Sequence, residues 1–136
     1  MLQIGEVATR VGLSLRTIRH WDEVGLVVPS ERTAGGFRLY TEADVERLLF
    51  IKTLKPLEFS IDQIRELLTV IDDIRADDGT DEEHTAQLQG RLAMFRAAAD
   101  SRTEVLRGQV HSLESLSRTL KSMSRTSSRG RAVEPH

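Results

Sequence analysis

The chain has 136 residues and no cysteine, so its sequence offers no disulfide, thiolate metal site or cysteine-held iron–sulfur cluster. Its net charge of −2 does not describe a strongly basic protein that binds nucleic acid without selectivity. The length predicts one small domain plus something elongated, and 4% aromatic residues favour helices over a large sheet-built core. No apolar run approaches the roughly 20 residues of a membrane span, and no leader peptide opens the sequence, so we expect a cytoplasmic protein without a membrane partner.

The chain begins with the pattern of two short helices. Residues Ile4–Arg10 and Thr17–Val24 each carry one apolar face, and Gly12 ends the first helix. Ser14 is a suitable N-cap for the second helix, and Gly25 stands where a left-handed C-terminal cap is expected. Two short helices joined by a glycine-bearing turn are typical of the helix-turn-helix, whose second helix enters the major groove of DNA.

A small hairpin is predicted directly after these helices. Leu26–Val28 and Phe37–Tyr40 form two extended arms around a polar loop that contains Gly35-Gly36. Arg32 and Arg38 flank the glycine pair. Helix, turn, helix and wing in this order predict a nucleic-acid reading head.

The segments IGEVATRVGLSLRTIRHWDEVGL, PSERTAGGFRLYTEADVERL and FSIDQIRELL together resemble the MerR family of bacterial transcription regulators. The resemblance implies a mostly α fold, in which a winged helix-turn-helix domain precedes a long coiled-coil dimerisation helix. It also implies a homodimer on a promoter palindrome that bends and untwists an over-long spacer for RNA polymerase. The family usually has two tyrosines where His20-Trp21 stand in this sequence.

Two further helices are predicted after the wing. Thr41 with Asp44, and Ser60 with Gln63, have the capping-box spacing that starts a helix. We expect both helices to cover the apolar side of the reading head, so that residues 1–75 form one DNA-binding domain.

The rest of the chain divides into three predicted segments. Residues 76–83 are acidic and without large apolar side chains, which predicts a solvated linker. Residues 84–124 carry a heptad pattern that predicts a dimerising coiled-coil helix, although Arg102 and Gln109 interrupt one of its columns. Residues 125–136 are rich in serine and arginine and predict a disordered basic tail. The predicted dimer interface comprises Leu88, Leu92, Phe95, Ala99, Leu106, Leu113, Leu116 and Leu120.

The candidate DNA contacts follow from the reading head. Arginines near the start of the second helix can bind guanine edges or phosphates, and a wing arginine can grip the backbone or enter a minor groove. Four residues keep alternatives: His20 as a surface histidine, Trp21 as a core residue, Tyr40 as an anchor of the wing, and Ser14 as a helix cap. The predicted set is Ser14, Arg16, Thr17, Arg19, His20, Trp21, Arg32, Arg38 and Tyr40.

The sequence predicts neither an enzyme nor a cofactor or metal site, because it lacks a phosphate loop, an H-E-x-x-H motif and a cysteine nucleophile. The alternative function is a helical dimeric adaptor that binds no nucleic acid. An effector of unknown identity would bind near Leu88–Phe95, where the fourth helix is expected to meet the long helix. The competing interpretation is that Phe95 only packs the dimer.

Overall fold

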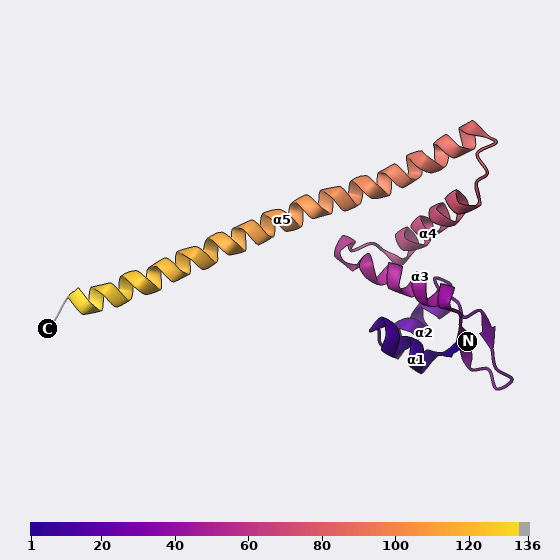
Figure 1. Cartoon of the computed structure of the whole chain (residues 1–136), viewed down its shortest axis with the longest axis horizontal. Coiled ribbons are helices and arrows are strands. Elements are labelled where there is room, and N and C mark those ends of the chain that lie inside the picture. The colour runs from indigo at the N-terminus through magenta and orange to yellow at the C-terminus, as the bar shows by residue number, and fades with distance from the viewer. Residues whose placement is uncertain (134–136) are drawn as a thin grey trace. The chain divides into compact units, whose positions relative to one another are not determined.

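The computed structural model of the chain describes the backbone of residues 1–133 and the side chains to residue 125 (Figure 1). Two compact units are present, Met1–Phe95 and Arg96–His136. The first unit holds all strands and the first four α-helices, and the second continues the last helix. The elements are β1 (Leu2–Gln3), α1 (Ile4–Val11), α2 (Leu15–Glu23), β2 (Glu31–Arg32), β3 (Arg38–Tyr40), α3 (Glu42–Thr53), η1 (Lys55–Leu57), α4 (Ile61–Ala76) and α5 (Glu82–Val133).

The predicted helix pair is confirmed as α1 and α2. Gly12 has a φ of +69°, and its N–H donates to the carbonyl of Ala8 at 2.9 Å, which closes α1 with a left-handed cap. The Ser14 hydroxyl accepts from the backbone N–H of Thr17 at 3.1 Å and therefore starts α2. Gly25, with a φ of +71°, lies just past the end of α2 as predicted.

The wing differs from the prediction in its first arm. That arm is Glu31–Arg32, which pairs with β3 in antiparallel fashion, and not Leu26–Val28. The backbone N–H groups of Leu26 and Val27 both donate to the carbonyl of Trp21, and both side chains are buried. These two apolar residues therefore belong to the core under α2 and not to a strand.

A third strand completes the sheet. The order is β1-β3-β2, and Leu2 lies opposite Tyr40 in the antiparallel pairing of β1 with β3. Strand β1 was not predicted, because two residues are too few to display an alternating pattern. This strand attaches the start of α1 to the wing.

Both capping boxes are formed as predicted. The Thr41 hydroxyl accepts from the N–H of Asp44, and the Asp44 carboxylate accepts from the N–H of Thr41, at 3.1 and 2.9 Å. Ser60 and Gln63 exchange the equivalent pair of bonds at the start of α4. Between the two helices lies η1, and Glu58 after it adopts a φ of +55°.

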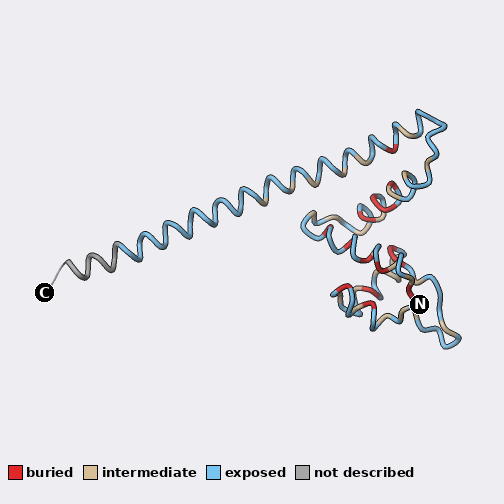
Figure 2. Tube along the Cα trace, viewed as in Figure 1, coloured by how far each residue is buried: buried red, intermediate tan, exposed pale blue. Residues whose placement is uncertain are grey.

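The main hydrophobic core of the first unit is formed by the reading head with α3 and α4, and the start of α5 packs against it. Figure 2 marks the buried residues along the chain. Leu88 is buried, and Leu92 and Phe95 pack against the cluster that the reading head forms with α3 and α4. The ring of Phe95 meets the ring of Phe59 edge-on, with 5.9 Å between centroids and an interplanar angle of 66°. Leu88, Leu92 and Phe95 are thus covered, fully or in part, by their own chain, and their place in a dimer interface stays a prediction.

The predicted acidic linker is a short, mostly exposed segment with its own side-chain hydrogen bonds. Only residues 77–81 separate α4 from α5. The Asp81 carboxylate accepts from the N–H groups of Glu83 and His84 at 3.1 and 3.2 Å, which caps the start of α5. The Asp77 carboxylate accepts from the Thr85 hydroxyl at 2.6 Å.

The last helix extends further than the heptad pattern indicated. The backbone stays helical to Val133, whereas the sequence predicted a disordered tail from residue 125. No proline interrupts the segment before Pro135, so the sequence allows the helix to continue. The remainder of the predicted tail, residues 134–136, lies outside the described residues. Within residues 1–133, no helix combines the length and the apolar character that crossing a bilayer requires.

Candidate nucleic-acid interface

Helix α2 presents a cationic outer face. Arg16, Arg19 and His20 are exposed, whereas Ile18 on the opposite face is fully buried. One broad, open depression is lined by Arg16, Thr17, Arg19, His20, Trp21 and Glu23. Among the described residues, neither Arg16 nor Arg19 has an ion-pair or hydrogen-bond partner. Their guanidinium groups are therefore free to bind an external anion or a base edge.

Two members of the predicted set have structural roles on α2. The Ser14 oxygen accepts from the Thr17 N–H and also lies 2.9 Å from the Thr17 hydroxyl, which supports the capping alternative. Trp21 is half-buried and packs against the core cluster, which supports its alternative as a core residue. A hollow of about 340 Å³ lies next to Trp21 and is also lined by Lys52 and Lys55.

These two lysines add charge beside the helix pair that the sequence pattern did not reveal. Lys52 donates from Nζ to the carbonyl of Val11 at 2.8 Å. A positive charge at this place stabilises the C-terminus of α1. Arg65 of α4 similarly donates to the carbonyl of Val24 at 2.5 Å, at the end of α2. Side chains from α3 and α4 thus hold the ends of both reading-head helices. Such contacts connect residues 41 positions apart and leave no local signal in the sequence.

Both wing arginines converge on one carboxylate. Arg38 donates from Nε to the Asp22 Oδ2 atom at 2.6 Å, and Arg32 donates from a terminal nitrogen to the same atom at 2.9 Å. The Asp22 side chain is only 9% exposed. The hydrogen bond to Asp22 raises the pKa of Arg38 above its ordinary value. Asp22 was not among the predicted site residues, although it is the residue of α2 to which both wing arginines donate hydrogen bonds.

The tip of the wing is a tight, hydrogen-bonded turn. The Thr33 N–H donates to the Phe37 carbonyl at 2.9 Å, and the Gly36 N–H donates to the Thr33 carbonyl at 2.8 Å. Gly36 has a φ of +83°, a conformation that side chains with a Cβ rarely adopt. Phe37 is 71% exposed beside this turn. The wing therefore presents an ordered loop to its surroundings.

Tyr40 does not reach the surface. The residue is fully buried, its hydroxyl has no hydrogen-bond partner among the described residues, and burial raises its pKa. The predicted phosphate contact of Tyr40 is corrected for this conformation, and the alternative of an anchor for the wing stands. The sequence could not distinguish the two because both place a tyrosine at the end of β3.

Replacing Tyr40 with Phe should leave DNA affinity unchanged and raise the free energy of unfolding by about 1 kcal/mol. The reason is that a buried, unpaired hydroxyl costs desolvation without a compensating hydrogen bond. A duplex titration of both proteins measures the DNA affinity, and urea denaturation measures the free energy of unfolding. Weaker DNA binding by a fully folded Tyr40→Phe variant would mean that the Tyr40 hydroxyl contacts DNA.

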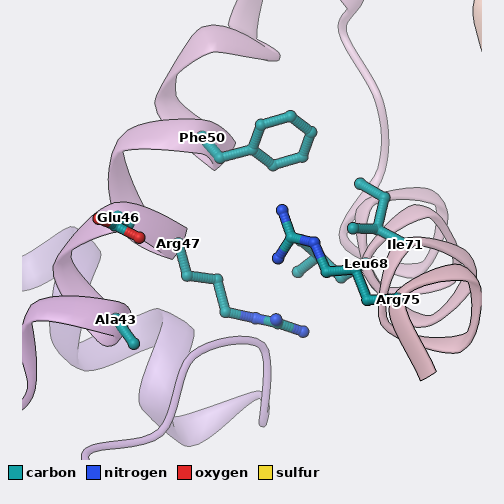
Figure 3. A pocket seen from close by; sticks show the side chains of 7 residues that line it. All are labelled: Ala43, Glu46, Arg47, Phe50, Leu68, Ile71 and Arg75. Carbon is teal, nitrogen blue, oxygen red and sulfur yellow. The ribbon is translucent and has the colours of Figure 1, made fainter.

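A separate hollow lies between α3 and α4 (Figure 3). It measures about 210 Å³, and Arg47 from α3 and Arg75 from α4 both extend into it. Arg47 forms a two-pronged ion pair with Asp72 at 3.1 and 2.8 Å, which joins the two helices. The other lining residues are Ala43, Glu46, Phe50, Leu68 and Ile71. None of these residues belongs to the predicted DNA-binding set.

Two helices joined by a tight turn, followed by a strand-built wing, define a winged helix-turn-helix, and the free arginines on α2 suit its reading helix. Comparison with family models places residues 2–70 in "MerR HTH family regulatory protein" and residues 45–123 in "MerR, DNA binding". The chain belongs to the MerR family and is a DNA-binding transcriptional regulator. Proteins of this family regulate transcription and are not enzymes.

Individual relatives agree with the family models. The regulator ZntR of Escherichia coli strain K12 is 36% identical over 120 residues, which cover 88% of this chain and 76% of ZntR. The regulator HmrR of Sinorhizobium medicae is 37% identical over 100 residues, which cover 70% and 67% of the two chains.

Solved structures share the fold. The N-terminal part of MtaN, the multidrug transporter activator of Bacillus subtilis, matches with a TM-score of 0.51 and 30% identity, covering 90% of this chain and 97% of that one. PbrR691 of Ralstonia metallidurans CH34, solved with lead(II), matches with a TM-score of 0.55 and 29% identity, covering 92% and 87%. Both likenesses extend over the winged domain and the long last helix.

Proposed function

We propose that this regulator acts as a homodimer on a palindromic promoter site and bends and untwists an over-long spacer for RNA polymerase. The observation that carries the proposal is an unpartnered apolar stripe on α5. Leu113, Leu116 and Leu120 are 64%, 52% and 55% exposed in the single chain, and Met123 is 61% exposed. Large apolar side chains repeated at heptad spacing are buried in coiled coils by a second helix.

The second helix of the proposed dimer belongs to another copy of the chain. A twofold dimer presents two copies of α2, so its binding site has matching twofold symmetry. Because Leu88, Leu92 and Phe95 already pack against side chains of their own chain, we place the proposed interface further along α5. It comprises Ala99, Leu106, Leu113, Leu116 and Leu120.

On DNA we assign two kinds of contact to the reading head. The exposed face of α2, with Arg16, Thr17, Arg19 and His20, enters the major groove. The wing, with Arg32 and Arg38, lies against the backbone. Bending and untwisting a duplex cost several kcal/mol, and contacts made at both half-sites offset that cost.

The function is tested by transcription in vitro from two promoters that differ only in spacer length. The protein should raise transcript output from the over-long spacer and should not raise it from a spacer of ordinary length. A bend assay on the same duplexes should detect curvature centred on the palindrome. Equal output from both promoters, with no bend, would contradict the mechanism.

A filter-binding titration separates this function from that of an adaptor. A regulator that neutralises phosphates loses affinity steeply as the salt concentration rises, with a slope set by the number of phosphate contacts. An adaptor would show no DNA binding that depends on salt.

A further inference from the structure

We propose that Asp22 is a positioning residue for DNA recognition, which fixes the angle between the wing and the reading helix. The proposal rests on the proposed function and adds a role for one residue. Asp22 is an acidic residue within a DNA-binding domain. Its carboxylate carries the charge that phosphates repel. By its charge alone Asp22 would oppose DNA binding, whereas its geometry points to a role in favour of it.

The geometry is a three-residue cluster that joins two elements. Asp22 lies in the last turn of α2, Arg32 lies in β2 and Arg38 lies in β3. One oxygen of Asp22 accepts from both arginines, at 2.9 Å from Arg32 and 2.6 Å from Arg38. In the described part of the chain, these are the hydrogen bonds that tie the wing strands to α2 through side chains.

The cluster is sheltered enough to hold its shape. The Asp22 side chain is 9% exposed and that of Arg38 is 23% exposed, so solvent and salt screen this pair less than a surface pair. Hydrogen bonds in which both partners are charged are shorter and stronger than neutral ones. Arg32 is more exposed, at 47%, and its second terminal nitrogen donates to the Gly36 carbonyl at 3.3 Å. The cluster therefore also supports the turn of the wing.

The arrangement leaves part of each arginine for DNA. Arg38 uses Nε for Asp22, so its two terminal nitrogens have no partner among the described residues. Those nitrogens are then presented in a fixed direction, which lowers the entropy lost when they bind a phosphate. Without Asp22 the same guanidinium would be a flexible cation on a loosely held hairpin. The negative charge of Asp22 thus weakens the attraction of the domain for DNA, while its hydrogen bonds fix the distance between the wing and α2.

The sign of one substitution distinguishes the two roles. Asp22→Asn keeps the shape of the side chain and removes its charge. If Asp22 only repels phosphates, the variant binds every duplex more tightly. If Asp22 positions the wing, the variant binds the palindrome less tightly while a random duplex is bound equally or better.

A matched control is available at the next position. Glu23 is exposed on the same helix and makes no side-chain hydrogen bond or ion pair among the described residues. Glu23→Gln removes the same charge without removing a hydrogen bond to the wing. Its effect on the palindrome and on the random duplex should be equal in size.

The experiment measures affinity for both duplexes over a range of salt concentrations, with the full chain. For Asp22→Asn we expect about a tenfold fall in palindrome affinity, the size expected for losing a charge-assisted hydrogen bond, and hence a lower specificity ratio. Combining Asp22→Asn with Arg38→Ala should give less than the sum of the two separate effects, because the residues act as one unit. Identical behaviour of Asp22→Asn and Glu23→Gln on both duplexes overturns the proposal.

Hydrogen exchange of the free protein provides a readout that does not require DNA. The amide hydrogens of Thr33 and Gly36, which close the turn of the wing, should exchange faster in Asp22→Asn than in the wild type, with a matching melting temperature. Unchanged exchange at these amides would also overturn the proposal. If wild-type protein fails to bind the palindrome while the wing amides of Asp22→Asn exchange faster as expected, the proposed function is wrong and the role of the cluster in holding the wing stands.

Discussion

Leu106→Asp should convert the proposed dimer into a monomer that binds the proposed palindrome weakly. Leu106 lies at the centre of the heptad column that also contains Ala99 and Leu113, in the part of α5 beyond the first unit. In a dimer the new carboxylate would be buried against apolar side chains, which costs several kcal/mol because an unpaired charge loses its hydration. Because two half-sites are bound together only by a dimer, DNA affinity should fall with the dimer.

Sedimentation equilibrium at micromolar concentration measures the expected loss of mass. Ser101→Asp is the matched control, because it introduces the same charge at an exposed position of α5 outside both apolar columns. That variant should remain a dimer. If Leu106→Asp also remains dimeric, the interface lies elsewhere on the chain and the heptad interpretation is wrong.

The helix pair was predictable because its signals are local. Gly12, Ser14 and Gly25 act within a few residues of the backbone groups they satisfy, and each does in the structure what its residue type predicts. The two capping boxes at Thr41 and Ser60 are local in the same sense. Patterns of this kind can be recognised without knowing the fold.

The wing was only half predictable because an apolar run has two interpretations. Leu26 and Val27 suit a strand and a core equally well, and only the contact of their backbone with Trp21 decides between them. Asp22 was missed for a related reason. Its partners Arg32 and Arg38 lie 10 and 16 residues away, so an acid in the last turn of a helix looks like an ordinary surface residue.

The heptad pattern identified an apolar stripe but not the partner of each segment. Leu88 satisfies the repeat, yet it is 3% exposed because side chains of its own chain already cover it. Leu113, in the same repeat, is 64% exposed. Periodicity reports that a face must be buried, and only the tertiary structure reports which face covers it.

Arg19→Ala should lower affinity for the palindrome by roughly 1–3 kcal/mol, with a much smaller effect on random DNA, if its guanidinium reads a base edge. The structure supports this assignment more strongly for Arg19 than for Arg38. Arg19 is exposed on α2 without a partner among the described residues, whereas Arg38 is held by Asp22. Arg38→Ala should therefore weaken binding to both duplexes and reduce the salt slope.

Arg75→Ala provides the matched control for Arg19→Ala, because it removes the same charge from α4, beside a hollow that contains none of the predicted DNA contacts. It should leave the ratio of palindrome to random affinity unchanged. Titrating both duplexes at one salt concentration gives that ratio for each variant. Equal losses on the two duplexes for Arg19→Ala would make Arg19 a phosphate contact. No loss on either duplex would mean that α2 is not the reading helix, since the arginine on its outer face would then contribute nothing to DNA affinity.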